Sequence, residues 1–479
     1  MRKNILIIGG GLGGLATACR LAARGHKVIL LEKNSILGGK AGSYEVGGYI
    51  FQPMPCFLDN TYELSRLFLD LGRRIEDYLE FVELQPFYKV FYEDKRWAEY
   101  IHEGNSAHLL VLDDGKNVLL DEIFHPNELS FITGSPWGDE TNIIRKTIRL
   151  VKTLGESYLS VQKFLAQRLP NPLLYSALVA PMVFQGVDPG QVSLRYALKT
   201  HLLFPPAMYY PLGGLHTIVE GLAQIFQELG GKIIYQAEVE QIIVHHNKVT
   251  GVRLVDGQKL YADYVICDAN REYTFRKFLK RPIAKWSKNQ FAGGPSAFIF
   301  CFGLKREIPD GVCLHHNFFL SSKFGEMVRT VFRENTFPAE IFFYLSAPTT
   351  TDPGLAPKGG SIYQVVVPVP NLEAEADWGL MLSVFRDQIV KIIEGVVMPD
   401  FRREIAVEFT ITPKDFSERF SFPLGSFYRD QPSFLEQMGI PSSVQTGYRN
   451  LFVIGGEHLS GRGISVNFQK ARKIDSLIP

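Results

Sequence analysis

The sequence predicts an α/β fold in which one domain is assembled from three separate stretches of chain. A second, α+β domain is formed by the two insertions between them. Three observations support this: a strand, glycine-rich turn and helix open the chain, a helix and several β-rich segments occupy its middle, and a strand with a glycine pair lies near its end. The expected divisions are 1–76, 205–275 and 446–479 for the first domain and 77–204 and 276–445 for the second.

Length and composition limit the classes of function. A chain of 479 residues is long enough for two or three domains. The net charge of +1, without a basic tail, argues against a nucleic-acid partner. Five cysteines without a C-x-x-C pair fit a reducing cytosol and argue against a disulfide framework. No apolar run reaches the length of about 18 residues that a transmembrane helix needs. The 35 phenylalanines are either ordinary core or the lining of an apolar site.

The first 32 residues carry the strongest motif. A short apolar strand over Ile5–Ile8 leads into a glycine-rich turn, a helix that ends at Gly25, and a second strand over Val28–Leu31 that is followed by Glu32. The glycines of the G-x-G-x-x-G turn are Gly9, Gly11 and Gly14, with Gly13 between the last two. Because strand, turn, helix, strand and acid follow in this order, the segment predicts a Rossmann-like dinucleotide-binding unit.

Each position of this motif has a physical task. The first glycine permits the tight turn, the second lets the backbone approach a pyrophosphate, and the third lets the helix pack closely on the strand. The free N–H groups of the helix favour the phosphates. Glu32 is expected to accept hydrogen bonds from a ribose diol.

A second glycine pair indicates which dinucleotide binds. The run "GGKAG" over Gly38–Gly42 looks like the continuation found in flavoproteins, in which a basic residue lies near the flavin diphosphate. Gly39 and Lys40 take these positions. We therefore expect FAD, although an exposed lysine is the simpler interpretation of Lys40 alone.

The middle of the chain predicts the next part of the same domain. Apolar residues repeat at helical spacing from Ile218 to Leu229, and Gly230 stops the helix. Four β-rich segments follow, with a hairpin at Asp256–Gly257. The backbone near Val239 is expected to pair with an adenine edge.

The two insertions differ in composition from the rest. Residues 77–125 alternate like strands, residues 141–204 look helical, and residues 276–445 combine apolar strands with a helix near 377–398. The segments "LLYSALVAPMVFQGV" and "HLLFPPAMYYPL" are either ordinary core or apolar loops that line a tunnel or dip into a lipid surface.

The end of the chain is expected to return to the site. A strand over Leu451–Ile454 leads into the pair Gly455–Gly456, after which Glu457 points at the cofactor. A helix is expected to begin near Gly463–Ile464, with its free N–H groups facing the flavin ring.

At this point the chain resembles the bacterial and fungal type of phytoene desaturase, within the flavin amine-oxidoreductase superfamily. The resemblance rests on the first 40 residues and on four later segments. These are "PLGGLHTIVEGLAQIFQELGGKI", "CFGLKREI", "LSAPTTTDPGLAPKG" followed by "VVVPVPNL", and "NLFVIGGEHLSGRGI". They span most of the chain in the family's order.

The resemblance implies non-covalently bound FAD, a long apolar tunnel for a polyene, and a cytoplasmic protein attached peripherally to a membrane. It implies that C=C bonds are introduced into a phytoene-like polyene, with hydride passing to flavin N5. Oxygen or a quinone is the expected electron acceptor, and a nicotinamide is an open alternative. The expected FAD contacts are Gly9, Gly11, Gly13, Gly14, Glu32, Gly39, Lys40, Val239, Gly456, Glu457, Gly463 and Ile464.

Two departures from the family keep alternatives open. Where desaturases of this type carry F-D-x-G-P, this chain reads "FQPMP", with Gln52 for the acid and Met54 for the glycine. No catalytic acid can be aligned in the first insertion. A carotenoid isomerase or saturase of the same fold, a flavin amine oxidase, and a flavoprotein that only binds a lipid or polyene are the alternatives.

The histidines do not predict a metal site. His245–His246 and His315–His316 are adjacent pairs, and neighbours in a strand point to opposite faces. No G-x-S-x-G, H-E-x-x-H or P-loop motif indicates another chemistry.

Overall fold

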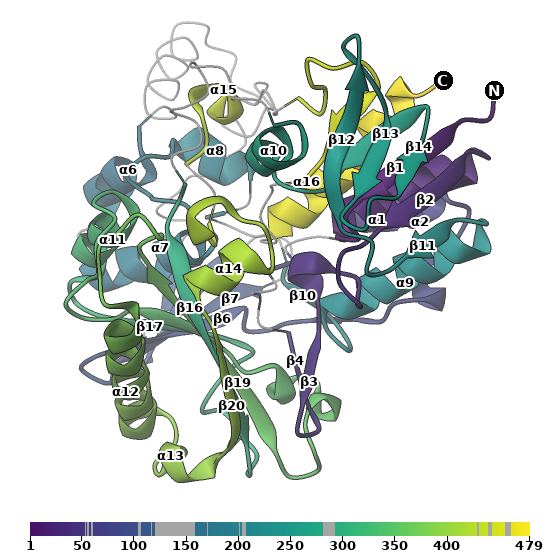
Figure 1. Cartoon of the computed structure of the whole chain (residues 1–479). Helices are drawn as coiled ribbons and strands as arrows, with labels where there is room; N and C mark the ends of the chain where they lie inside the picture. The colour runs from purple at the N-terminus through teal and green to yellow at the C-terminus, as the bar shows by residue number, and fades with distance from the viewer. Residues whose placement is uncertain are drawn as a thin grey trace, which may run out of the picture.

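Two large sheets organise the molecule (Figure 1). The computed structural model describes residues 1–52, 54, 57–58, 61–103, 107–115, 117–119, 159–169, 171–200, 202–203, 207–280, 293–428, 431–438, 443–455 and 461–479. Within these residues, one large sheet has five strands and the other has nine. The domain boundaries expected from the sequence stay a prediction.

The five-stranded sheet is parallel throughout, in the order β11-β2-β1-β15-β21. Its strands are β1 (Asn4–Ile8), β2 (Lys27–Leu31), β11 (Lys232–Ile234), β15 (Tyr264–Cys267) and β21 (Leu451–Val453). Strands buried on both faces read as continuous apolar runs, as "ILII" in β1 does. Segments from the start, middle and end of the chain thus meet in one sheet.

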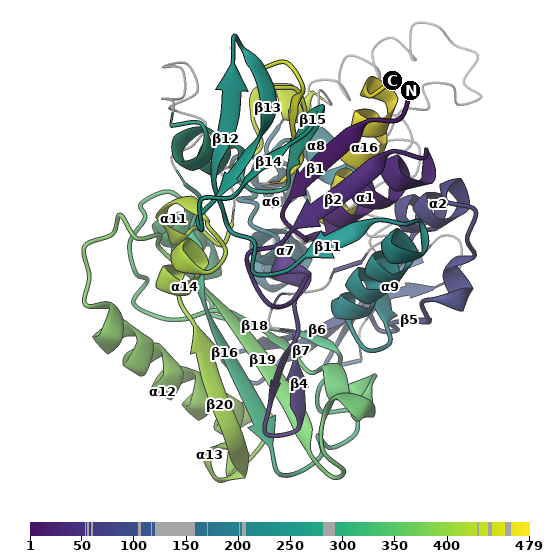
Figure 2. The ribbon, with the colours of Figure 1, turned by 45° about the vertical axis from the view of Figure 1, so that its right-hand side comes forward.

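Each face of this sheet has its own cover (Figures 1 and 2). Ile5 and Ile7 pack with the helices α1 (Leu12–Ala23), α9 (Leu215–Glu228) and α16 (Gly461–Leu477). On the other face, Leu6 and Ile8 pack against a three-stranded antiparallel layer. That layer comprises β12 (Val239–His245), β13 (Lys248–Leu254) and β14 (Lys259–Tyr261). Because the side chains of β1 alternate between the two faces of the sheet, this strand packs against the helices on one face and against the antiparallel layer on the other.

The nine-stranded sheet has the order β20-β16-β19-β18-β17-β6-β7-β8-β9. All neighbouring strands in it are antiparallel except β17 and β6, which are parallel. The bounds are β6 (Tyr88–Tyr92), β7 (Trp97–Glu103), β8 (Ala107–Leu112), β9 (Asn117–Leu119), β16 (Ser296–Leu304), β17 (His316–Leu320), β18 (Phe343–Ser346), β19 (Ser361–Val369) and β20 (Ile405–Ile411).

Strand β16, which lies between β20 and β19, separates two cores. Phe298, Phe300 and Phe302 pack on one face against α12 (Trp378–Val396). Residues of the opposite parity, such as Ile299, face a larger core that includes α6 (Val161–Arg168), α7 (Pro172–Phe184) and α8 (Leu194–Lys199). The run "SAFIFCFGL" is buried along its whole length because both faces of the strand are covered.

Shorter elements connect these layers. The strands are β3 (Tyr44–Val46), β4 (Tyr49–Phe51), β5 (Phe81–Glu83) and β10 (Tyr209–Pro211). The helices are α2 (Tyr62–Asp70), α10 (Arg271–Tyr273), α11 (Phe324–Phe332), α13 (Phe401–Glu404), α14 (Pro413–Glu418) and α15 (Phe434–Gln437). Single helical turns lie at Gly39–Ala41, Ile75–Asp77, Thr274–Phe278, Pro348–Thr350, Pro353–Leu355 and Pro423–Gly425.

The segment that was a candidate lipid-dipping loop is instead a core helix. Residues 173–184 belong to α7, and its positions 176–184 are all buried. Of the second apolar segment, Met208 and Tyr210 are buried in the same core. Of the two interpretations that the sequence left open, these described residues support ordinary core, because they pack in the core that covers one face of the nine-stranded sheet. No helix among the described residues has the length and apolar character needed to cross a bilayer.

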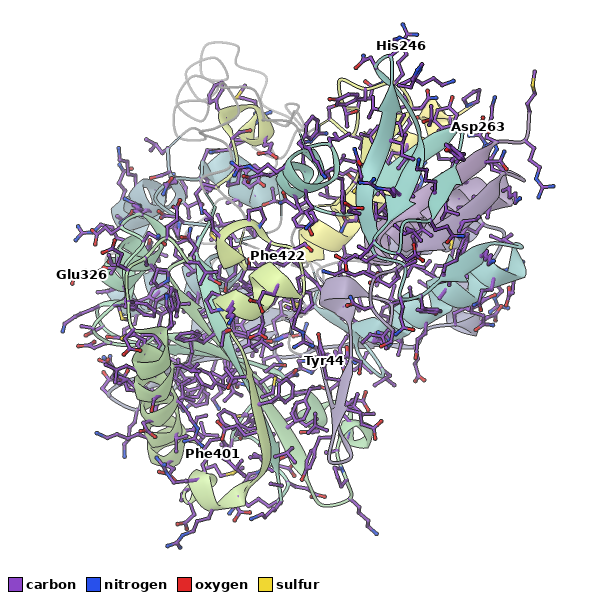
Figure 3. The ribbon with its side chains drawn as sticks, in the orientation of Figure 1. Tyr44, His246, Asp263, Glu326, Phe401 and Phe422 are labelled. Carbon is purple, nitrogen blue, oxygen red and sulfur yellow. The ribbon has the colours of Figure 1, made fainter. Side chains whose placement is uncertain are left out.

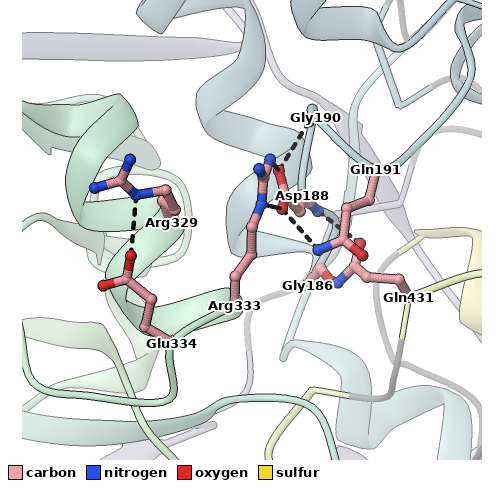
Figure 4. Close-up of polar contacts among 8 residues, drawn as sticks. All are labelled: Gly186, Asp188, Gly190, Gln191, Arg329, Arg333, Glu334 and Gln431. Carbon is pink, nitrogen blue, oxygen red and sulfur yellow. Dashed lines mark hydrogen bonds and ion pairs between the residues drawn. The ribbon is translucent and has the colours of Figure 1, made fainter. Parts of the chain in front are cut away.

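An ion pair with a buried carboxylate joins the loop after α7 to the end of α11 (Figure 4). The guanidinium group of Arg333, which follows α11, donates to both carboxylate oxygens of Asp188 at 2.5 and 3.0 Å. The Asp188 side chain is 2 % exposed, and the backbone N–H of Gly190 and the amide of Gln191 also donate to it. Gln431 accepts from the Asp188 backbone N–H at 2.8 Å. The carboxylate is thus held by donors from several elements.

Replacing Asp188 with alanine is expected to lower the free energy of unfolding by about 2 kcal/mol, because charge-assisted hydrogen bonds to a buried carboxylate are lost. The loss stays near this value because the Arg333 side chain is 39 % exposed and keeps part of its hydration. Denaturant-induced unfolding of the D188A protein provides the measurement.

Glu334→Ala is the matched control. Glu334 pairs with Arg329 at 3.1 Å, but the two side chains are 47 % and 61 % exposed. An exposed pair of this kind contributes about 0.5 kcal/mol or less. Equal losses in the two variants would contradict a structural role for the buried pair.

Candidate functional site

A cleft lies at the carboxyl ends of the parallel strands. It encloses about 1090 Å³, part of which is open to solvent. Ligands of open α/β sheets bind at this edge. Its lining includes Ile8, Gly9, Gly10, Gly11, Leu12, Gly13, Leu31, Glu32, Lys33, Asn34, Gly38, Gly39, Lys40, Ala237, Glu238, Val239, Asp268, Ala269, Asn270, Arg419, Phe420, Ser421, Phe422, Gly455 and Asn467.

The glycine turn between β1 and α1 forms the floor of the cleft. Gly9 has φ of +100°, a conformation that favours glycine. A Cβ atom on Gly14 would collide with the carbonyl oxygen of Gly9, so only glycine allows this approach of helix and strand. Gly11 is the N-cap of α1 and has no side-chain cap of its own. The first N–H groups of the helix therefore face the cleft, where an anion would bind.

Glu32 stands at the end of β2, as the motif predicts, and is 5 % exposed. Its Oε2 accepts from the Gly10 backbone N–H at 2.8 Å, and its Oε1 accepts from the backbone and side chain of Asn34 at 2.9 and 3.0 Å. These bonds fix the carboxylate beside the turn. Oε1 already accepts two hydrogen bonds, so Oε2 keeps the one lone pair that is left for a ribose hydroxyl.

The second glycine pair packs directly on the first motif. The Gly38 N–H donates to the carbonyl oxygen of Gly10 at 2.8 Å. This contact brings Gly39 and Lys40 to the cleft. The Lys40 ammonium group lies 4.2 Å from the centre of the Phe422 ring. Lys40 is therefore held against an aromatic face at the cleft rather than being a lysine remote from it.

The opposite wall comes from two distant segments. Val239, the first residue of β12, lines the cleft as expected for a residue near an adenine. Residues 419–422, which follow α14, also line it and were missed by sequence reasoning. Figure 3 shows Phe422 at the junction of the two halves of the molecule. The run Arg419–Phe422 combines a cation with aromatic side chains. This composition is the only feature of the sequence that could have indicated its place in the cleft.

Asp268 is a further residue that sequence reasoning missed. It directly follows β15, and its carboxylate lies against the glycine turn, where the backbone N–H groups of Gly14 and Gly11 lower its pKa. A narrow part of its surface still touches the cleft, but protein atoms surround the rest. This burial raises the pKa of Asp268 to about 7, against the lowering effect of the two backbone donors. Its place at the carboxyl end of a strand beside β1 is a signal that could have found it.

The C-terminal part of the site is only partly described. Gly456 and Glu457 lie outside the described residues. The helix α16 begins at Gly461, two residues before the expected start, so that Gly463 lies within its first turn. Ile464 is 1 % exposed and packs in the helix-side core rather than lining the cleft. Asn467, one turn further, lines the cleft instead.

The cleft suits a dinucleotide diphosphate. Lys33, Lys40 and Arg419 line the cleft with the start of α1 and supply positive charge there. The Asn467 Oδ1 atom is buried and has no hydrogen-bond partner among the described residues. A ligand hydroxyl or amide in the cleft would satisfy it. The residues present therefore fit FAD, and the individual contacts stay predictions.

The rings of each adjacent histidine pair lie close together, contrary to the expectation that they point to opposite faces of a strand. The ring centres of His245 and His246 are 4.1 Å apart, and those of His315 and His316 are 4.6 Å apart. The rings do not point to opposite faces, because β12 ends at His245 and β17 begins only at His316. In the part of the chain that the structure describes, no group of three His, Cys, Asp or Glu residues forms a metal-binding cluster.

Comparisons with known proteins agree with this geometry. The family model described as flavin containing amine oxidoreductase matches residues 12–269. A lycopene-forming phytoene desaturase of Pseudescherichia vulneris is 28 % identical and is covered over 99 % of both chains. A neurosporene-forming phytoene desaturase of Rhodobacter capsulatus is 27 % identical, over 99 % of this chain and 93 % of the relative.

A solved structure supports the fold. The crystal structure of an oxidoreductase from Methanosarcina mazei has a TM-score of 0.64 and 16 % identity, and the match covers 98 % of this chain and 100 % of that one. At this identity the likeness concerns the fold alone.

Gly14→Ala is expected to weaken flavin binding at least about tenfold, because the added methyl group collides with backbone and displaces α1 from the turn. The flavin retained per purified protein, read from its visible absorbance, gives the result. Gly395→Ala is the control, since Gly395 lies in α12 with no atom within 4 Å of an added Cβ. The control should keep full flavin content and gain up to about 1 kcal/mol of stability. Full flavin content in G14A would contradict the assigned role of the turn.

Proposed function

Because the chain belongs to the family of flavin containing amine oxidoreductases, we propose that it is an FAD-dependent desaturase that introduces C=C bonds into a phytoene-like polyene. The observation that supports the substrate class most strongly is the full-length similarity to phytoene desaturases, which extends over both large sheets. The cofactor is FAD, and it supplies an acceptor for hydride when bound.

The chain's own residues bind and orient the cofactor. We assign the diphosphate to the turn at Gly11–Gly14 and the ribose to Glu32. The cations Lys33 and Lys40 lie beside them and compensate the phosphate charge. The short aromatic segment at residues 420–422 covers the cleft from the other side and limits the access of water. The roles of Gly456 and Glu457 remain part of the same proposal.

We place the apolar substrate beside the large core of the nine-stranded sheet that contains Phe57, Phe318 and Tyr344. The His316 ring packs on Phe57, and its Nδ1 lies 2.7 Å from the Tyr344 hydroxyl oxygen. Burial lowers the pKa of His315 to about 3 and that of His316 well below its usual value. Both rings are therefore neutral at physiological pH. An uncharged surface of this kind suits a hydrocarbon.

The altered loop has a structural task of its own. Gln52 donates through its side-chain amide to the carbonyl oxygen of Gly213 and accepts from the His216 backbone N–H at 3.3 Å. Asp352, from the "TTTDPG" run, accepts from the Gly213 N–H at 2.7 Å. Gln52 and Asp352, which are far apart in the sequence, thus both bond to residues at or just before the start of α9. Because Gln52 replaces the family's acid, a redox-neutral isomerase or a saturase is the second candidate.

An amine oxidase is less well supported. An amine substrate requires an aromatic cage with room for a polar nitrogen. The aromatic cluster nearest the loop is closed instead, with the Phe57 ring centre 5.3 Å from that of Tyr344 and 6.2 Å from that of Phe318. Among the described residues this cluster leaves no cage. A polyene-binding flavoprotein without activity is the non-enzyme alternative.

Peripheral attachment to a membrane is also part of the proposal. Its support is the chemistry of the substrate, which dissolves in lipid rather than water. Two exposed apolar side chains lie at α15, Phe434 (72 %) at its start and Met438 (39 %) directly after its end. They are candidates for contact with a lipid surface. Oxygen or a quinone is the proposed electron acceptor, and cytoplasmic location is part of the same proposal.

The function is tested under anaerobic conditions with purified flavin-loaded protein and liposomes that carry phytoene or its C30 analogue. Visible flavin absorbance is followed, and the pigments are then extracted. Bleaching of the flavin together with a longer chromophore is expected, because each desaturation reduces the cofactor and extends conjugation. Liposomes without polyene serve as the control.

The outcomes separate the candidates. A changed pigment geometry with an unbleached flavin would indicate an isomerase, and bleaching by amines alone would indicate an amine oxidase. A saturase is detected by starting from reduced flavin, which would be oxidised as a conjugated polyene loses colour. A flavin that responds to none of these would overturn the desaturase proposal in favour of a binding protein.

A further inference from the structure

Asp268 occupies the place at which an anion is expected. We propose that Asp268 couples the binding of FAD to the uptake of one proton, because its carboxyl group must be neutral when the diphosphate lies at the start of α1. This inference depends on FAD binding at the cleft and is independent of the reaction that follows.

The position of the carboxylate within the glycine turn is the first argument. A Cβ atom on Gly11 would lie 2.5 Å from Asp268 Oδ2, and one on Gly13 would lie 2.6 Å from Asp268 Oδ1. The backbone N–H groups of Gly14 and Gly11 favour the ionised form of the same carboxylate, but they lower its pKa by less than burial raises it. Asp268, which follows β15, thus brings a carboxyl group to the start of α1, where the N-cap residue Gly11 has no side chain.

The second argument is electrostatic. The N-terminus of a helix attracts negative charge, and in FAD-binding turns of this kind the attracted group is the diphosphate. The Asp268 carboxylate lies against the same glycine turn, so a diphosphate bound there would be close to it. Like charges in a site of low dielectric repel strongly, so the carboxyl group is expected to take up a proton.

The groups around Asp268 do not cancel this repulsion. Glu32, at the end of β2, raises the pKa of Asp268 further, whereas Lys470, on α16, lowers it by a smaller amount than burial raises it. The turn at Gly9–Gly14 contains no titratable side chain. The described end of the β21 segment, Ile454–Gly455, contains none either.

The remaining charged groups near Asp268 either interact with other protein groups or line the cleft. On the segment after β15, Arg271 donates to backbone carbonyls of residues 443 and 445, and Glu272 pairs with Arg276 at 2.9 Å. Four further charged residues line the same cleft, namely Lys33, Lys40, Glu238 and Arg419. Lys33, Lys40 and Arg419 attract the diphosphate and therefore favour binding. They do not remove the repulsion between the diphosphate and an ionised Asp268.

The sign of the pH dependence follows. Burial places the pKa of Asp268 at about 7 without the cofactor, and the phosphates raise it further in the complex. Below pH 7 the proton is already bound, and FAD affinity is constant. Above pH 7 the proton must be taken up on binding, so the Kd for FAD rises by up to about tenfold per pH unit until the pKa of the complex is reached.

Fluorescence titration of flavin-free protein with FAD between pH 6 and 9 measures this dependence. The native protein should show the rise in Kd above pH 7. Asp268→Asn keeps the size and an acceptor oxygen but has no charge, so its Kd should be independent of pH. At pH 8.5 the D268N protein should bind FAD at least about tenfold more tightly than the native protein.

Asp263→Asn is the matched control. Asp263 precedes the same strand, is exposed, and accepts from the Asn4 backbone N–H at 2.8 Å. This variant should follow the native curve. A native Kd that stays constant from pH 6 to 9, or a D268N curve that keeps the native slope, would overturn the proposal.

A second measurement needs no variant. Calorimetry of FAD binding to the native protein at pH 8, in buffers of different ionisation enthalpy, gives the number of protons taken up. About one proton per FAD is expected, and zero would overturn the proposal even if D268N does not fold. Because both readouts are binding measurements, failure of the desaturase proposal would leave them interpretable.

Discussion

The close approach of α1 to β1 is the constraint on which the rest of the structure depends. Gly14 touches the Gly9 carbonyl oxygen, and no other residue has room there. This contact holds the start of α1 at the carboxyl end of β1, where Gly11, Leu12 and Gly13 line the cleft. The strands that flank β1 then carry Glu32 and Asp268 to the same edge. This one steric requirement thus determines where the diphosphate of the cofactor is expected to bind.

The two halves of the molecule divide the chemistry between charged and neutral surroundings. The cleft carries cations for a diphosphate, whereas the facing core of the nine-stranded sheet holds its histidines in the neutral form. Residues 419–422 belong to the second half but line the cleft of the first. A flavin ring at this junction would have its diphosphate in a polar site and its reactive edge towards apolar protein. Such separation is what removal of hydrogen from a hydrocarbon requires.

Local motifs were predictable, and contacts between distant segments were not. The glycine turn, Glu32, Lys40 and the helix near 377–398 follow from spacing within a few turns of chain. Asp268 lies more than 250 residues from the glycines that it contacts, so nothing in its local sequence indicated them. The helix α7 was ambiguous because an apolar run looks the same in a core as at a lipid surface. The histidine pairs were misjudged because their position at strand ends was not foreseen.

The order in which the strands of the parallel sheet are synthesised determines when the sheet can be completed. Its edge strand β21 spans Leu451–Val453 and pairs with β15, while β1 was synthesised more than 440 residues earlier. Pairings of such long range are made late in folding, because loop closure precedes any gain from contact. The cofactor cleft is therefore completed only after almost the whole chain has left the ribosome. Until then, β15 is the edge of the sheet on that side, and its unpaired backbone groups are open to pairing with other chains.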